Sequence, residues 1–199
     1  LKGVLGSFRL ESHGVDLPNE IAIINRAELS DTHVQLLLND TTATPKDTAQ
    51  SEVRWKVDLR HLKLKNVSFS MQLPADSMRL AAHVEEAQVN DAEADLKNLH
   101  YGLRSFLVSG TSVNYDVGTA EPAEGFDPSH IALRDIRIGL DSMYYRGRNM
   151  NAVIREFSMN DRSGLSVTSL TGRVFANDTI IQVPSLKLLT PHSEMDLTA

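Results

Sequence analysis

The residues of this chain that could do chemistry are scattered along it and do not cluster. Its seven histidines never pair at the HxH or HExxH spacing of a metal motif. A zinc site needs ligands that converge on one point, so we predict a surface or strand-edge role for each histidine, and neither a metal nor a cofactor in the protein. The seven are His13, His33, His61, His83, His100, His130 and His192.

Three acidic residues, Asp91, Glu93 and Asp95, occupy alternate positions and would share one face of a strand. Such a run superficially resembles a calcium-binding loop. The glycine and the terminal bidentate acid of that loop are missing here. We interpret the three carboxylates as a solvated strand face or turn.

Nucleophile and phosphate motifs are also absent from the sequence. The segment GLSVT (164–168) begins like a G-x-S-x-G nucleophile elbow, but Thr168 stands where the second glycine is required. No glycine-rich phosphate loop or dinucleotide fingerprint occurs, and no carboxylate pair can be nominated for a β-solenoid glycosidase. We predict that the protein is not an enzyme.

Arg146 and Arg148 flank Gly147 in the phrase YRGRNM (145–150). Two arginines at a hairpin tip could bind a phosphate headgroup. We favour the simpler interpretation that they keep the tip soluble, with Gly147 taking the positive φ of a tight turn.

Composition describes an ordinary folded protein, with 41% hydrophobic and 23% charged residues. Twenty basic and 26 acidic residues give a net charge of −6, which argues against nucleic acid and against a generic anionic membrane surface as partners. The chain has no cysteine, which excludes disulfides and Cys-ligated zinc.

The pattern of apolar residues predicts β-strands throughout. In VSFSMQL (67–73) four large apolar side chains alternate with Ser68, Ser70 and Gln72, so that one face is apolar and the other polar. We expect further strands in short bursts within 1–39, then at 53–59, 78–90, 93–103, 106–117 and 149–161, with a hairpin at 145–150.

Internal similarity predicts tandem repeats. Residues 1–18 can be laid over 167–184 with Gly6 on Gly172 and Pro18 on Pro184, and 96–103 can be laid more weakly over 167–174. Two polar stretches without a regular apolar pattern separate the units. The expected organisation is the end of a repeat (1–39), a crossover linker (40–52), a repeat (53–117), a second crossover linker (118–129) and a repeat cut short (130–199).

Such strands can bury their apolar faces in two ways. The sheet can close into a sandwich, or it can curl into a trough whose lining is left for an apolar guest. Periodicity alone does not distinguish these two outcomes.

The phrase SLTGRVFANDTIIQVPSLKLLTPHSEM (169–195), together with units of about five strands joined by polar crossovers, resembles the TamB branch of the AsmA-like envelope proteins, within the repeating β-groove (bridge-like) lipid transfer class. The resemblance implies an all-β fold in which tandem repeats of about five antiparallel strands form an elongated, curved, taco-like sheet with a hydrophobic groove. It also implies a periplasmic location in a diderm bacterium and an inner-membrane anchor. The anchor and the C-terminal domain of such proteins are missing from this chain, so we expect a middle segment.

The implied function is to shield lipid acyl chains during phospholipid transport between the membranes and outer-membrane assembly. Expected partners are phospholipid acyl chains, neighbouring repeats of the same longer chain and, through regions outside this chain, an outer-membrane barrel. The alternative is a structural or adhesive surface array of β-sandwich repeats with no lipid ligand. The predicted groove lining is Val67, Phe69, Met71, Leu73, Leu99, Leu103, Ile136, Ile138, Leu170, Val174, Ile181 and Val183.

Overall fold

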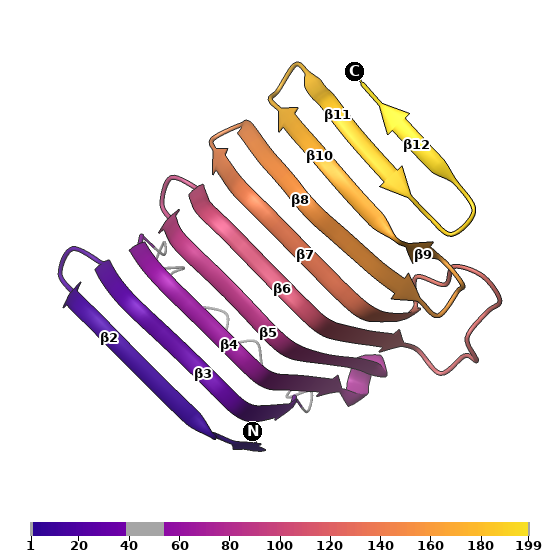
Figure 1. Ribbon diagram of the computed structural model, residues 1–199. Coiled ribbons are helices and arrows are strands. Elements are labelled where there is room, and N and C mark those ends of the chain that lie inside the picture. The colour runs from indigo at the N-terminus through magenta and orange to yellow at the C-terminus, as the bar shows by residue number, and fades with distance from the viewer. Residues whose placement is uncertain (1, 39–53, 199) are drawn as a thin grey trace.

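The protein forms one open, curved β-sheet (Figure 1). The structure, a computed structural model, describes residues 2–38 and 54–198. One 3₁₀ turn, η1 (Pro74–Asp76), interrupts the strands. The strands are β1 (Lys2–Val4), β2 (Ser7–Asp16), β3 (Ile21–Leu37), β4 (Lys56–Leu73), β5 (Met78–Asp95), β6 (His100–Val117), β7 (His130–Arg146), β8 (Asn149–Asp161), β9 (Ser166–Val167), β10 (Ser169–Ala176), β11 (Ile181–Leu189) and β12 (Glu194–Leu197).

The main path of the sheet is β1-β3-β4-β5-β6-β7-β8-β10-β11-β12, with β2 beside β3 and β9 beside β8. All pairs are antiparallel except β3 and β4, which run parallel. The predicted all-β, elongated and curved sheet is confirmed, and the one departure from antiparallel pairing among its described strands is the β3–β4 pair near one edge.

The two predicted linkers have different positions in this topology. Because β3 and β4 are parallel, the chain must return to the other rim of the sheet between them; the predicted crossover at 40–52 lies outside the described residues. Segment 118–129 joins the antiparallel neighbours β6 and β7, so it is a loop at one rim and not a crossover. The division into repeats stays a prediction.

The central strands bend at a shared level. Asp31 in β3, Asn66 in β4, Gly110 in β6 and Asp135 in β7 all have positive φ, between 50° and 59°. They lie in adjacent rows of the ladder, and strands β3 to β6 turn together between their middle and the rim that carries η1 (Figure 1). Asp, Asn and Gly are the residues that adopt this left-handed conformation at the lowest cost.

The bend explains why the strands are longer than the sequence pattern indicates. At Asn66 the alternation shifts by one residue, so that Leu64 and Val67 share a face although they are three positions apart. A period-2 pattern therefore breaks in mid-strand without the strand ending. The short bursts predicted within 1–39 are parts of two longer strands, and the separate strands predicted at 53–59 and 67–73 are both parts of β4.

Several local predictions can be compared with the strand bounds. Strands at 67–73, 78–90 and 149–161 are confirmed, and so is the hairpin at 145–150, where Gly147 has φ of 61°. A strand at 93–103 is wrong, because residues 96–99 form the turn between β5 and β6.

The proposed sequence alignments do not match equivalent structural positions. Aligning 1–18 with 167–184 places the end of β2 on the start of β11, and aligning 96–103 with 167–174 places the turn at 96–99 on the end of β9 and the start of β10. The structure instead relates two other turns, 16–19 (DLPN) and 95–98 (DLKN), which lie 79 residues apart and have the same internal hydrogen bonds.

Candidate functional site: the apolar face

One side of the sheet, here called the apolar face, carries Val67, Phe69, Met71 and Leu73 of β4 and the residues in register with them. The partners of Phe69 and Met71 in β3 and β5 are Val34, Leu36, Ala82 and Leu80. This side is apolar in every strand from β3 to β7. The opposite side is called the polar face.

Apolar side chains continue across the sheet in rows that run perpendicular to the strands. One such row links strands β3 to β10 by direct pairing, and it consists of Ile24, Leu59, Ala92, Leu103, Met143, Ala152 and Val174. A neighbouring row includes Tyr101 and Tyr145, whose rings stack with centroids 6.2 Å apart. The apolar face is therefore a continuous band and not a set of separate patches.

The described part of the chain contains no second layer over this face. Its only buried hydrophobic residues are Ala22, Ala87, Val108 and Ile136, and no large side chain is fully buried. Such a sheet lacks the closed core of a sandwich.

The buried residues also locate the inner side of the bend. Apart from Ala22, they lie in the two apolar rows that flank the bend, as do the buried hydroxyl residues Thr32 and Thr111. A bend brings side chains together on its inner side and spreads them on its outer side. The apolar face is thus the concave side, and the trough that it forms runs across the strands.

The structure places the predicted lining residues on this face, with one exception. In β4, β6, β7, β10 and β11 they occupy apolar rows. Leu99 does not: it lies in the β5–β6 turn, has φ of 54° and is 53% exposed. Ile181 is on the face but at the rim, 71% exposed.

Apart from Ile138, the lining residues that lie between the bend and the next position at which the apolar–polar alternation shifts were not predicted from the sequence. Leu62, Leu64, Phe106, Leu140 and Phe157 lie there, in rows joined by direct pairing. In the sequence these residues form short apolar pairs, such as Leu62 and Leu64, that are out of step by one position with the alternation of the residues on either side. Recognising this pattern required knowledge that Asn66 and its neighbours shift the alternation without ending the strand.

The polar face carries cross-strand ion pairs. Arg104 Nε lies 2.6 Å from Asp91 Oδ2, and Arg155 Nη1 lies 3.1 Å from Asp141 Oδ1. Lys63 pairs with Glu86 at 3.4 Å. These exposed pairs contribute little stability each, but they mark this side as the one in contact with water.

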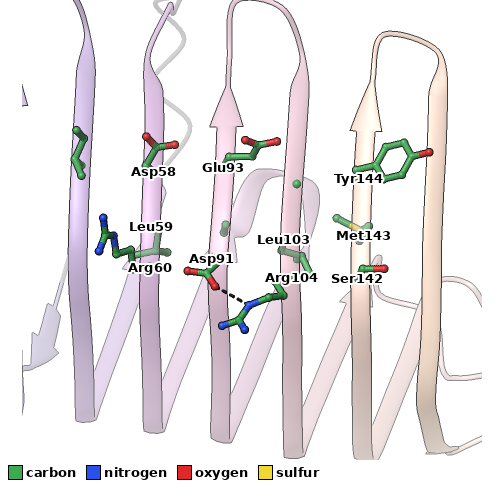
Figure 2. A pocket seen from close by; sticks show the side chains of 13 residues that line it. Asp58, Leu59, Arg60, Asp91, Glu93, Leu103, Arg104, Ser142, Met143 and Tyr144 are labelled. Atoms are coloured by element: carbon green, nitrogen blue, oxygen red, sulfur yellow. Dashed lines mark ion pairs between the residues drawn. The ribbon is translucent and has the colours of Figure 1, made fainter.

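A shallow hollow of about 540 Å³ lies on the polar face around Gly102 (Figure 2). Figure 2 shows Asp58, Glu93 and Tyr144 along one edge of this hollow. Glu93 extends over Gly102, where an added Cβ would lie 3.0 Å from Glu93 Oε1, and Arg146 Nη2 reaches the same oxygen at 2.7 Å. Two carboxylates that line the hollow, Asp91 and Glu93, form ion pairs with Arg104 and Arg146.

The two hairpin arginines are paired with carboxylates. Arg146 contacts Glu93, as above, and Arg148 contacts Asp178. Both guanidinium groups therefore have anionic partners, one in β5 and one in the turn between β10 and β11, consistent with a role at a solvated tip.

Among the histidines, three make side-chain hydrogen bonds with protein neighbours. His61 lies 2.9 Å from Asn90 Oδ1 and His83 lies 2.9 Å from Ser68 Oγ. The residues that the structure describes contain no group of three or more His, Cys, Asp or Glu side chains able to hold a metal ion.

His130 belongs to the hydrogen-bond cluster that closes the β6–β7 loop. Asp127 accepts hydrogen bonds from the backbone N–H groups of Ala123 and Ser129, and its Oδ2 lies 2.9 Å from His130 Nδ1. The backbone N–H of Ala123, then the His130 side chain, then the N–H of Ser129 lower the pKa of Asp127 to about 2.

Two carboxylates of the polar face also have lowered pKa values. Hydrogen bonds from the Asn98 backbone and side chain lower the pKa of Asp95, with Lys56 adding to the effect. The Gln88 amide, and after it Lys63, lowers the pKa of Glu86. Both shifts arise from hydrogen bonds and nearby lysines that favour the ionised form of the carboxylate.

No helix of membrane-spanning length and hydrophobicity occurs in the part of the chain that the structure describes. Comparison with protein-family models, with curated proteins and with solved structures found no match to this chain.

Proposed function

We propose that this chain is a segment of a lipid-transport trough whose apolar face shields acyl chains from water. The observation that carries the proposal is an uncovered, concave and continuous apolar face in a single-layer sheet. A surface of this kind is unfavourable in water unless something covers it. A lipid tail gains about 0.8 kcal/mol for each methylene removed from water.

The dimensions of the sheet suit a guest that extends across the strands. The ten strands of the main path, roughly 4.8 Å apart, give a trough about 43 Å long. One leaflet of a bilayer has a hydrocarbon thickness of about 15 Å. The trough is thus longer than one acyl chain, as a conduit requires, and longer than a pocket for a single tail would need to be.

The chemistry of the face favours a guest recognised by its hydrophobicity alone. Its two buried hydroxyl groups do not face outward: Thr32 Oγ1 donates to the Ser30 carbonyl, and Thr111 Oγ1 is buried. Charged pairs occupy the other face. Apart from the hydroxyl groups of tyrosines such as Tyr101 and Tyr145, the lining offers few directional contacts, so an apolar chain can slide along it.

The resemblance to the TamB branch of the AsmA-like envelope proteins supports the same proposal. We accordingly assign the chain to the periplasm of a diderm bacterium, within a longer protein anchored in the inner membrane. Neighbouring repeats would continue the sheet at its edges, β2 and β12, and phospholipid would be the cargo. An outer-membrane barrel would be met through regions outside this chain.

The test is crosslinking to lipid in the cell. A photoreactive amino acid at position 69, on the apolar face, is expected to crosslink to phospholipid, whereas the same group at exposed position 72 on the polar face of β4 is not. Phe69→Glu and Met71→Arg should abolish lipid crosslinking from a probe at Leu103 while circular dichroism still reports a β-sheet. Gln72→Glu is the matched control and should leave crosslinking unchanged.

Two results would contradict the proposal. One is equal lipid crosslinking from positions 69 and 72, and the other is lipid crosslinking that Phe69→Glu leaves intact. A structural or adhesive array would instead cover the apolar face with a second sheet, so native mass spectrometry of the purified protein would show a dimer without phospholipid.

A further inference from the structure

All six methionines of the chain lie on the apolar face. Met71, Met78, Met143 and Met150 pair with apolar residues of that face in both neighbouring strands. Met159 alternates with Asn160 and stands two positions from Phe157, which pairs with Ile138. Met195 pairs with Leu188, and its neighbour Asp196 lies on the polar face, where it contacts Lys187 at 3.4 Å.

Apolar character alone does not confine a residue to this face. Leu107, Val153 and Phe175 are on the polar face, in register with Gln88, Arg173 and Gln182, respectively. The methionines are nevertheless all on the other side. Because the chain has no cysteine, its only sulfur atoms line the trough.

These methionines are open to solvent to different degrees. None is buried, and Met150 and Met195 are 37% and 45% exposed. In an ordinary protein core, packing protects methionine from oxidants. Here the uncovered face gives a small oxidant access to the thioethers as long as no lipid covers them.

We propose that the apolar face is an oxidation-sensitive surface, on which peroxide converts methionine to methionine sulfoxide and thereby blocks the passage of acyl chains. The inference rests on the proposed function. In the reaction the thioether sulfur supplies an electron pair, the O–O bond of hydrogen peroxide breaks, and one oxygen atom becomes the S=O group. The second oxygen leaves as water, so that sulfur is oxidised by two electrons and the peroxide is reduced by two.

The consequence follows from the position of the sulfoxide. A sulfoxide is polar and a strong hydrogen-bond acceptor, and an acyl chain that covered it would offer no donor. Met143 lies in the row that crosses from β3 to β10, and Met71 lies between Leu36 and Leu80. A single sulfoxide in either place interrupts the apolar path, and we expect a loss of affinity of about tenfold or more for a tail that crosses it.

The experiment uses the whole chain, hydrogen peroxide and phosphatidylcholine with a fluorescent acyl chain. Peptide mass spectrometry measures sulfoxide at each methionine, circular dichroism monitors the sheet, and 8-anilinonaphthalene-1-sulfonate reports apolar surface independently of lipid. The Met71→Leu/Met143→Leu variant, close to volume-conserving, should retain most lipid binding after peroxide. Met71→Gln, a polar side chain of similar length, should lose binding without peroxide.

The outcomes separate this inference from the proposed function. Sulfoxide at Met71 and Met143 with weakened lipid and dye binding in the parent chain, and protection in the double leucine variant, supports the inference. Full sulfoxide formation with unchanged binding overturns it, and so does normal binding by Met71→Gln. If the untreated chain takes up no lipid, the proposed function fails, while a peroxide-sensitive dye signal would still show that the face itself is altered.

Discussion

Two hairpins of this sheet have the same plan and different surroundings. The hairpin β2–β3 lies at one edge of the sheet and β5–β6 lies in its middle. Their turns, DLPN (16–19) and DLKN (95–98), each place an asparagine so that its N–H and its side-chain amide both contact the aspartate three residues earlier. The same 79-residue offset relates the bend residues Asp31 and Gly110.

The features that the two hairpins share belong to the strand pair itself and do not depend on where the pair lies in the sheet. Ser-Asp-Thr in β3 and Ser-Gly-Thr in β6 both put a positive φ at the middle residue and a buried threonine after it. The edge strand β2 is exposed along its whole length, yet the bend is the same. The bend in β3 therefore does not need its outer neighbour to be covered by a further strand.

Their differences show what the neighbours impose. At the edge, the Asp31 side chain accepts a hydrogen bond of 2.7 Å from Asn66. In the middle, Glu85 extends across Gly110, so an added Cβ would lie 1.8 Å from Glu85 Oε2 and 2.7 Å from Glu85 Cβ. The position admits a side chain at the edge and requires glycine in the middle.

Of the substitutions proposed here, the one that gives the middle hairpin the bend residue of the edge hairpin should have the largest effect on stability. Gly110→Asp is expected to lower the free energy of unfolding by about 2–3 kcal/mol, because the new side chain collides with Glu85 at a position of positive φ. Urea denaturation followed by circular dichroism measures this. Asp31→Gly is the reciprocal control and should cost about 0.5–1 kcal/mol, through its exposed hydrogen bond.

A double-mutant cycle makes that prediction sharper. Glu85→Ala should recover a substantial part of the loss in Gly110→Asp, because it removes the atoms with which the new side chain collides. Equal destabilisation by Gly110→Asp with and without Glu85 would show that the requirement for glycine has another cause.

The threonines after the bend residues should respond in opposite directions. Thr32 Oγ1 donates to the Ser30 carbonyl at 3.0 Å and accepts from Gly6 N at 3.4 Å, whereas Thr111 Oγ1 is buried without a partner. Thr32→Val should therefore cost about 1 kcal/mol, and Thr111→Val should stabilise the protein by up to about 1 kcal/mol. Thermal unfolding of the two single variants measures both signs, and a loss of stability in Thr111→Val would contradict the comparison.

Substitutions in the two turns test the equivalence of the hairpins through a smaller change in stability, which should be the same in both. Asn19→Ala and Asn98→Ala each remove the side-chain amide contact of one turn, and each should cost about 0.5 kcal/mol. Equivalence predicts equal losses in the two variants. A clearly larger loss for Asn98→Ala would show that the middle hairpin depends on its turn more than the edge hairpin does.

The sequence could predict the type of fold because alternation within each strand segment is strict, as in Val67 to Leu73. It could not predict strand length, because the left-handed residues at the bend shift the alternation in a way that resembles a strand end. The turn DLKN was hidden by its apolar neighbours, which is why Leu99 was placed in a strand and in the lining. The predicted lining residues of β4 rested on alternation alone and lie on the face where it put them.

The sequence alignments that match apolar residues did not reveal that the β2–β3 and β5–β6 hairpins are equivalent. Apolar residues recur in every strand, so many alignments match them. The polar residues that define a turn, Asp16 with Asn19 and Asp95 with Asn98, are fewer and geometrically specific. Pairs of that kind are the better guide to repeats in a sheet of this type.

The loop after the middle hairpin is closed by hydrogen bonds to the carboxylate of Asp127. The folded-state pKa of this carboxyl, about 2, lies below its ordinary value of 3.8. A lowered pKa means that the contribution of Asp127 is present above about pH 4 and is lost as the pH falls from about 4 to about 2. At neutral pH, Asp127→Asn should lower stability modestly, and between pH 4 and pH 2 the difference from the parent chain should shrink, because both then carry a neutral side chain. Urea midpoints measured across this range check the prediction, and a difference that stays constant down to pH 2 would mean that the ionised carboxylate does not hold the loop.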